Sequence, residues 1–138
     1  MNFFNTVSGE KELFTPNRKN VGLYICGPTV YSDTHLGHAK SYVSFDVMKR
    51  WLEYRGHEVT HIQNFTDVSD ETALGASKEG IDELEFTRKY ENEFLDKMKL
   101  LSNTSATKYT RASDFVKQIA EETKKLLDAD KAYQTDEG

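Results

Sequence analysis

The 138-residue chain contains a single cysteine, at position 26, and this scarcity limits both its redox chemistry and its metal chemistry. One thiol excludes an internal disulfide and is typical of proteins of a reducing compartment. A zinc ion in a protein takes three or four side-chain ligands, and no second cysteine is present to supply one. A zinc site at Cys26 would therefore require ligands far away in sequence or outside these residues.

Long apolar runs and basic blocks are also lacking. No apolar segment is long enough to cross a bilayer, and residues 1–14 lack the apolar core of a signal peptide, so we expect a cytoplasmic protein. The net charge is −5, so charge alone gives no indication of nucleic-acid binding. Any contact with nucleic acid would have to come from local patches or from parts outside this sequence.

The chain alternates between strand and helix patterns. Residues 21–26 (VGLYIC) are a short apolar run typical of a buried parallel strand, residues 36–55 have helical spacing, and residues 57–65 predict the next strand. Two further helices are expected after residue 80 and near residue 112, with a polar connection at 102–109 between them. The sequence thus predicts an α/β fold, Rossmann-like, with a parallel sheet and flanking helices. The apolar residues expected to face the core are Ala39, Val43, Val47, Trp51, Phe45, Met48 and Leu52 in the first helix, Phe86, Tyr90, Phe94, Met98 and Leu101 in the second, and Phe115, Ile119, Leu126 and Leu127 in the third.

Polar segments follow both predicted strands at the point where each strand ends. Residues 26–38 (CGPTVYSDTHLGH) follow the first strand, and residues 64–70 (NFTDVSD) follow the second. Open parallel sheets bind their ligands beyond the carboxyl ends of the strands. We therefore expect both segments to contribute to one site.

Two histidines, His35 and His38, open the first predicted helix and fall on one face of it. A helix N-terminus offers unpaired N–H groups and a positive dipole end, which favour phosphate. Gly37 would let a ligand approach the backbone, and the two imidazoles could donate hydrogen bonds to phosphate oxygens. The alternative is that one histidine caps the helix and the other is a surface residue.

Cys26 has three interpretations: a small buried hydrophobe, a nucleophile served by a nearby histidine, or a metal ligand. In the second segment, Thr66 can exchange hydrogen bonds with a ligand, and Asp67 and Asp70 could bind an amine or magnesium. The alternative is a loop and a helix cap, which we favour for Ser69 and Glu71. The residues alone leave these alternatives open.

The combination of these pieces resembles the class I cysteinyl-tRNA synthetase family. The pieces are NTVSGEKELFTP, then YICGPTVYSDTHLGHAKSYVSFDVMKRWLEYRGHEVTHIQNFTD, and more loosely TRASDFVKQI. HLGH stands in the place of the HIGH signature of this class, between a cysteine that ends the first strand and the QNFTD segment. The resemblance covers nearly the whole chain but about the first third of a full-length family member. Residues 1–138 would accordingly be the N-terminal portion of a Rossmann-like catalytic domain, with the remaining domains absent from this chain.

The resemblance implies ATP-dependent activation of L-cysteine to cysteinyl-adenylate and its transfer to tRNA(Cys), with Mg²⁺ accompanying ATP. Cys26 falls on the first zinc ligand of the family, and zinc would select the substrate thiol over a hydroxyl because thiolate is the softer ligand. His35, Gly37 and His38 fall on positions that contact the ATP phosphates, and the two histidines would be the catalytic residues. Five residues fall where the cysteine and the adenylate are held: Gly27, Thr29, Ser41, Asn64 and Thr66.

The chain departs from the family pattern in two places. Residues 66–71 read TDVSDE in place of TDIDDK, so that Ser69 replaces an acid and Glu71 a lysine, and TRAS (residues 110–113) replaces PRAT. The other zinc ligands, the KMSKS loop and the anticodon-binding region are absent. Three alternatives follow: a cysteine ligase of mycothiol biosynthesis, which joins cysteine to an amino sugar; a truncated, non-catalytic paralogue that binds nucleotide or tRNA; and a generic nucleotidyl transferase, which would leave Cys26 without a role.

Overall fold

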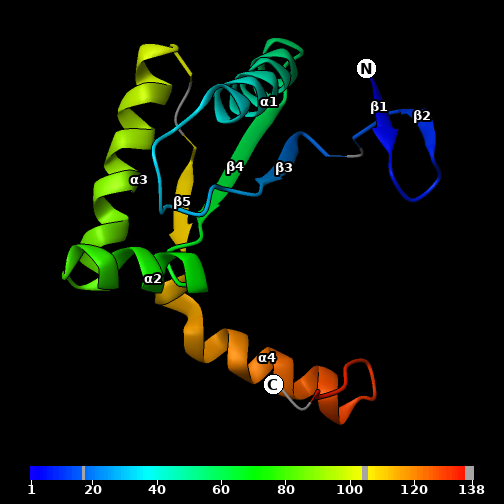
Figure 1. The fold of residues 1–138 in the computed structure, drawn as a ribbon. Helices are drawn as coiled ribbons and strands as arrows, with labels where there is room; N and C mark the ends of the chain where they lie inside the picture. Colours follow the sequence, from blue (N-terminus) through cyan, green and yellow to red (C-terminus); the bar gives the residue numbers. More distant parts are fainter. Residues whose placement is uncertain (17, 104–105, 136–138) are drawn as a thin grey trace.

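A parallel sheet of three strands, in the order β3-β4-β5, forms the centre of the structure (Figure 1). The computed structural model describes residues 1–16, 18–103 and 106–135. β3 spans Asn20–Ile25, β4 spans Glu58–Phe65 and β5 spans Lys108–Arg111. The parallel pairing of β3 with β4 confirms the α/β fold that the sequence predicts.

β5 corrects the sequence prediction, which placed a polar connection at residues 102–109. The strand pairs in parallel with the last part of β4, from Ile62 opposite Lys108 to Phe65 opposite Arg111. Thr104 and Ser105 of the expected connection lie outside the described residues. A strand of four residues has too short a pattern to be recognised from sequence, and its pairing with β4 supplies what the pattern lacks.

One face of the sheet is buried. The side chains of Ile25, His61, Gln63 and Phe65 occupy alternate positions and are buried, whereas Tyr24 on the other face of β3 is 66% exposed. This alternation has the period of a strand with one covered face. The buried face is therefore the one that the helices cover.

Helix α1 (Leu36–Tyr54) returns the chain from β3 to β4 and packs on β4. Its position agrees with the prediction, and Leu52 is buried as expected, but two other residues of the predicted face are exposed. Val47 and Trp51 are 60% and 42% exposed, whereas Asp46 and Lys49 are each 8% exposed. Apolar residues occur all around this helix, so spacing alone does not select the buried row.

Two helices follow β4. The sequence did not predict α2 (Asp70–Glu79), but it did predict α3 (Glu83–Leu100) with its apolar stripe, of which Phe86, Phe94 and Met98 are buried. The ring of Phe94 contacts the rings of Tyr42 and Phe65 edge to face, with centroids 4.9 Å and 5.6 Å apart. α3 thus closes the core between α1 and the sheet. The core cluster comprises Ile25, Val30, Tyr42, Phe65, Phe94 and Met98.

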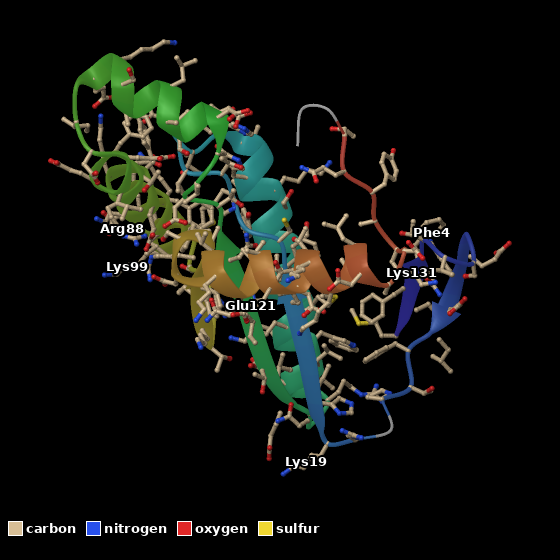
Figure 2. All side chains as sticks on the ribbon, turned by 90° about the horizontal axis from the view of Figure 1, so that it is seen from below. Phe4, Lys19, Arg88, Lys99, Glu121 and Lys131 are labelled. Carbon is tan, nitrogen blue, oxygen red and sulfur yellow. The ribbon has the colours of Figure 1, made fainter. Side chains whose placement is uncertain are left out.

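The two ends of the chain leave this body (Figure 1). β1 (Asn2–Asn5) and β2 (Glu10–Leu13) form an antiparallel hairpin before β3. After β5, a 3₁₀ turn η1 (Ala112–Phe115) leads into α4 (Val116–Asp128), which is marked by Glu121 in Figure 2. The predicted inward face of this last helix is wrong, because α4 has no buried residue. Phe115, Ile119 and Leu126 are 37%, 53% and 45% exposed. A search of the described residues finds no helix with the length and apolar character that crossing a membrane requires.

Candidate functional site

The two polar segments meet at the carboxyl edge of the sheet, as predicted. Thr29 and Thr66 form an isolated parallel bridge beyond the ends of β3 and β4. The Thr66 N–H donates to the carbonyl of Pro28 at 3.0 Å, and the Val30 N–H donates to the carbonyl of Thr66 at 3.2 Å. These bonds prolong the parallel pairing for one step past the strands and fix the backbone of both segments.

Asn64 connects the two segments through its side chain. Its Oδ1 accepts hydrogen bonds from the backbone N–H of Gly27 at 2.6 Å and from the hydroxyl of Tyr24 at 3.1 Å, and its Nδ2 donates to Oγ1 of Thr66 at 3.3 Å. A Cβ at Gly27 would lie 1.3 Å from the carbonyl oxygen of Asn64, so only glycine fits there. The structure therefore brings together four of the predicted residues, Gly27, Thr29, Asn64 and Thr66.

Ser41 is a predicted residue that these hydrogen bonds do not reach. It is exposed on the second turn of α1. Within the described part of the chain, the hydrogen bonds that join Asn64 to Gly27 and Thr66 (the Asn64 group) do not include Ser41. Its assignment rests on the family resemblance alone.

Cys26 follows β3 directly and is exposed, which rules out the buried hydrophobe. Its thiol lies 3.8 Å from the carbonyl of Gly27, and its own carbonyl accepts a hydrogen bond from the Tyr42 hydroxyl at 3.1 Å. Burial, with a smaller contribution from Cys26, raises the pKa of Tyr42, so this hydroxyl stays protonated and acts as a hydrogen-bond donor. Tyr42 therefore holds the backbone that carries the thiol.

The described residues do not complete a metal site around this thiol. Among residues 1–16, 18–103 and 106–135, no group of three or more His, Cys, Asp or Glu side chains is placed to hold a metal ion. A thiolate is a suitable zinc ligand, but one ligand alone does not fit zinc, which takes at least three from a protein. A zinc site at Cys26 would therefore need ligands in addition to those that the described residues supply.

The two histidines stack at the start of α1, with ring centroids 3.9 Å apart and planes 17° from parallel. Nδ1 of His35, the N-cap, accepts from the N–H of Gly37 at 3.1 Å, and Nδ1 of His38 accepts from the N–H of His35 at 3.4 Å. A neutral imidazole that accepts at Nδ1 carries its proton on Nε2. Each ring thus caps the helix and keeps an Nε2–H donor, so capping and phosphate binding are compatible.

His38 stays neutral near pH 7. Burial lowers its pKa most, the neighbouring His35 lowers it further, and the Glu93 carboxylate acts in the opposite direction. A neutral imidazole can donate a hydrogen bond without the repulsion that two stacked cations would suffer. The pair is therefore suited to donating from Nε2.

Gly37 leaves room for the ring of His35. A Cβ at this position would lie 2.9 Å from Cε1 and 3.0 Å from Nδ1 of His35. The His35 ring thus occupies the space that a larger side chain at this position would need. Gly37 consequently serves the capping geometry of the histidine pair.

Asp67 is also corrected by the structure, because its carboxylate is not available to an amine or to magnesium. The residue is fully buried, and it accepts hydrogen bonds from the backbone N–H of Ser113 at 2.9 Å and from the Ser113 hydroxyl at 2.6 Å. Nη1 of Arg88 lies 3.5 Å from the same carboxylate; Figure 2 labels Arg88 on α3. Ser113 replaces the threonine of PRAT, and it retains the hydroxyl that this contact uses.

The other departures from the family pattern fall on α2. Ser69 is the N-cap of this helix, and its hydroxyl accepts from the N–H of Thr72 at 3.2 Å, which confirms its predicted capping role. Asp70 and Glu71 are exposed in the first turn. The N–H of Glu71 itself, followed by Ser69, lowers the pKa of the Glu71 carboxyl, as expected at a helix N-terminus. Glu71 thus suits the helix start in which it lies.

Sequence reasoning missed the charged residues that support the site from α3. Glu91, 2% exposed, accepts hydrogen bonds from Nε of Arg111 at 2.9 Å and from Nη1 of Arg88 at 2.6 Å. Glu93 accepts two hydrogen bonds from Thr34. The Arg111–Glu91 and Thr34–Glu93 contacts join residues 20 and 59 positions apart, so no local pattern marks them.

Comparison with known proteins gives consistent results. The family model described as the catalytic domain of class I (C) tRNA synthetases matches residues 13–138. Curated relatives named cysteine–tRNA ligase include one from Chlamydia pneumoniae, 43% identical over 95% of this chain and 28% of its own length. Another, from Thermococcus onnurineus, is 40% identical over 98% of this chain and 29% of its own length. This chain thus spans less than a third of the relatives that it matches.

Solved structures of the same fold include the Mycobacterium tuberculosis methionyl-tRNA synthetase in complex with methionyl-adenylate. It has a TM-score of 0.59 and 19% identity, over 67% of this chain and 18% of that one. LeuRS of Agrobacterium radiobacter, in a ternary complex with tRNA and LeuAMS, has a TM-score of 0.58 and 22% identity, over 65% and 12%. These likenesses confirm the Rossmann-like fold. The family model matches residues 13–138, which is nearly all of this chain. The chain therefore belongs to the catalytic-domain family of class I (C) tRNA synthetases.

Proposed function

We propose that residues 1–138 form the N-terminal portion of the Rossmann-like catalytic domain of a cysteine–tRNA ligase. The observation that carries this proposal is that Asn64 joins Gly27 to Thr66 at the carboxyl edge of the sheet. The stacked histidines lie further along the segment that leaves β3 at this edge. Relatives named cysteine–tRNA ligase match nearly the whole chain, which favours L-cysteine, ATP and tRNA(Cys) as the substrates. The cytoplasm, where tRNA is charged, is the proposed location.

In the first step, a carboxylate oxygen of cysteine attacks the α-phosphorus of ATP. The new O–P bond forms as the bond to the bridging oxygen breaks, and pyrophosphate leaves. His35 and His38 donate from Nε2 to phosphate oxygens on which negative charge accumulates, and Mg²⁺ accompanies ATP. No residue forms a covalent intermediate, so catalysis comes from positioning and charge stabilisation.

Gly27, Thr29, Asn64 and Thr66 hold the cysteine and the adenylate, with Ser41 contributing from α1. The Asn64 side chain keeps the two segments at a fixed separation, because its amide is bonded to both. An amide that spans the site in this way prepares the binding geometry before the substrate arrives. The role of Gly27 is then to let the two backbones approach.

Cys26 is the proposed zinc ligand of this portion of the enzyme. Its thiol is exposed beside Gly27, and zinc bound there would coordinate the substrate thiol and reject serine. Replacing Cys26 with serine should lower the zinc content of the whole gene product, measured by atomic emission. Unchanged zinc content would contradict the assignment.

The decisive experiment measures cysteine-dependent exchange of pyrophosphate into ATP by the whole gene product, with Mg²⁺ and zinc supplied. We expect exchange with cysteine and not with serine. His38→Asn should lower kcat about 100-fold, as expected when a donor to a developing charge is removed. The matched control is His57→Asn, at the opposite end of β4, which should leave exchange unchanged.

The outcome distinguishes the proposal from its alternatives. Absence of exchange with cysteine would overturn adenylate formation and favour a non-catalytic nucleotide- or tRNA-binding paralogue. Exchange with cysteine, followed by transfer to an amino sugar and not to tRNA(Cys), would replace the ligase assignment with a mycothiol-type cysteine ligase. Transfer to tRNA(Cys) would support the proposal in full.

A further inference from the structure

An acidic side chain lies beside the paired histidines, at a place where phosphate binding would favour positive charge. Oε2 of Glu93 accepts hydrogen bonds from the backbone N–H of Thr34 at 3.1 Å and from the Thr34 hydroxyl at 2.6 Å. Thr34 immediately precedes His35. A carboxylate near a phosphate site repels the phosphate and weakens its binding. The position of Glu93 therefore requires an explanation.

The part of α3 that carries Glu93 is packed into the core. The next residue, Phe94, is 3% exposed and packs between the rings of Tyr42 and Phe65. Nζ of Lys97, one turn further along, lies 3.9 Å from the Glu93 carboxylate and compensates part of its charge. Glu93 is therefore a fixed acceptor, supplied by an element 59 residues away from Thr34.

The two hydrogen bonds fix the backbone and the side chain of Thr34 at once. The Thr34 N–H donates to Glu93 on α3, and the following residue is the N-cap whose ring accepts from Gly37. The orientation of the His35 imidazole depends on the backbone that enters this cap. Anchoring Thr34 thus restricts the direction in which the first histidine of the pair presents Nε2.

We propose that Glu93 is a positioning residue, which holds Thr34 and through it sets the orientation of His35 toward ATP. The inference rests on the proposed function of the histidine pair. In this role Glu93 acts as a hydrogen-bond acceptor for Thr34, and holding Thr34 does not require its negative charge. A neutral acceptor of the same shape should therefore replace it.

The test measures the KM for ATP and for cysteine in pyrophosphate exchange by the whole gene product. Glu93→Ala should raise the KM for ATP or lower kcat about tenfold, the effect of losing both hydrogen bonds to Thr34, and leave the KM for cysteine unchanged. Glu93→Gln, which keeps a carbonyl acceptor, should stay within about twofold of the parent. The matched control is Glu85→Ala, an exposed glutamate in the first turn of the same helix, which should have no effect.

Thr34→Val separates the two bonds, because it removes the hydroxyl and keeps the N–H. It should have a smaller effect than Glu93→Ala, about threefold, and the double variant should be no worse than Glu93→Ala alone. Effects that multiply in the double variant would overturn the inference. So would an unimpaired Glu93→Ala, or a Glu93→Gln as impaired as Glu93→Ala.

Amide hydrogen exchange at Thr34 decides the contact independently of catalysis. Glu93→Ala should speed exchange of the Thr34 N–H about tenfold, while amides in the middle of α3 keep their parent rates. Equal rates at Thr34 in parent and variant would overturn the inference. A parent protein that lacks pyrophosphate exchange would contradict the proposed function, whereas failure of this inference shows itself only in the comparison of variants.

Discussion

Ser113 donates two hydrogen bonds to Asp67, from its backbone N–H to Oδ1 at 2.9 Å and from its hydroxyl to Oδ2 at 2.6 Å. The pair connects the segment after β4 with the turn after β5. Because Asp67 is fully buried, these bonds replace the water that its carboxylate gave up on folding. Thr66, which we place in the substrate site, is the residue next to this anchor.

Ser113→Ala should lower the free energy of unfolding by about 1–3 kcal/mol, because it leaves one oxygen of a buried carboxylate short of a donor. Ser113→Thr should keep most of the stability, since threonine retains the hydroxyl. Urea denaturation followed by circular dichroism measures both changes. Ser77→Ala, an exposed serine on α2, is the control and should change stability by less than about 0.5 kcal/mol. Equal stability of Ser113→Ala and the parent would show that the hydroxyl contributes nothing.

A second prediction concerns the ion pair between Arg111 and Glu91. Nε and Nη2 of Arg111 donate to the two oxygens of Glu91 at 2.9 Å and 2.5 Å, which is the two-pronged geometry that only a guanidinium provides. The hydrogen bonds to Glu91 are also the largest cause that raises the pKa of Arg111. Arg111→Lys should therefore destabilise the fold by about 1–2 kcal/mol despite keeping the charge.

The control for this change is Arg55→Lys, at the exposed C-cap of α1, which should be neutral within about 0.5 kcal/mol. Urea denaturation under the same conditions compares the two variants. If Arg111→Lys proved as stable as Arg55→Lys, a point charge would suffice at this position. The argument from guanidinium geometry would then be wrong.

The elements that carry a strong local pattern could be predicted from sequence. The apolar run of β3, the long helical spacing of α1 and the stripe of α3 each mark their element, and the rule that ligands bind beyond parallel strands located the Asn64 group. The buried face of α1 could not be predicted. Val47 and Trp51 are the more apolar residues, yet Asp46 and Lys49 are buried, because contacts made by the rest of the fold decide the rotation of the helix.

The supporting contacts could not be predicted for a related reason. Asp67 and Ser113 are 46 residues apart, and Glu93 and Thr34 are 59 apart. A carboxylate on a charged helix looks like one of many solvated acids until the fold brings a donor to it. The histidine pair, in contrast, could be predicted, because residues three positions apart at the start of a helix fall on the same face.

Asn64 gives a prediction on activity. Asn64→Asp keeps an acceptor for the Gly27 N–H but loses the Nδ2 donor to Thr66, and it adds a negative charge at the place where we propose that cysteine and ATP bind. It should lower kcat/KM for cysteine in pyrophosphate exchange by tenfold or more, since about 1.4 kcal/mol corresponds to a factor of ten. Tyr24→Phe removes only the Tyr24 hydroxyl that donates to the same Oδ1, and it should lower kcat/KM for cysteine by less than about threefold. An Asn64→Asp variant with parent activity would remove Asn64 from the site.

His61 gives a prediction on the pH dependence of stability. It is 5% exposed on β4, and neither ring nitrogen has a hydrogen-bond partner among the described residues. Burial lowers its pKa, the nearby Lys49 lowers it further, and Asp46 acts in the opposite direction. The folded state therefore binds the proton more weakly than the unfolded state, in which a histidine has a pKa of about 6.5.

The sign follows from linkage. Above pH about 6.5 the ring is neutral in both states and protonation costs nothing, whereas below that value the unfolded state takes up the proton first and stability falls until the lowered pKa of the folded state is passed. His61→Phe should remove this contribution, so that its free energy of unfolding declines less than that of the parent between pH 7 and pH 5 in urea denaturation. At pH 7.5 the variant should be at least as stable as the parent, because a flat apolar ring replaces an imidazole whose two nitrogens have no hydrogen-bond partner among the described residues. His57→Phe, half-buried at the start of β4, is the control for the substitution itself. A parallel decline for parent and His61→Phe would show that His61 is not the group whose protonation weakens the fold.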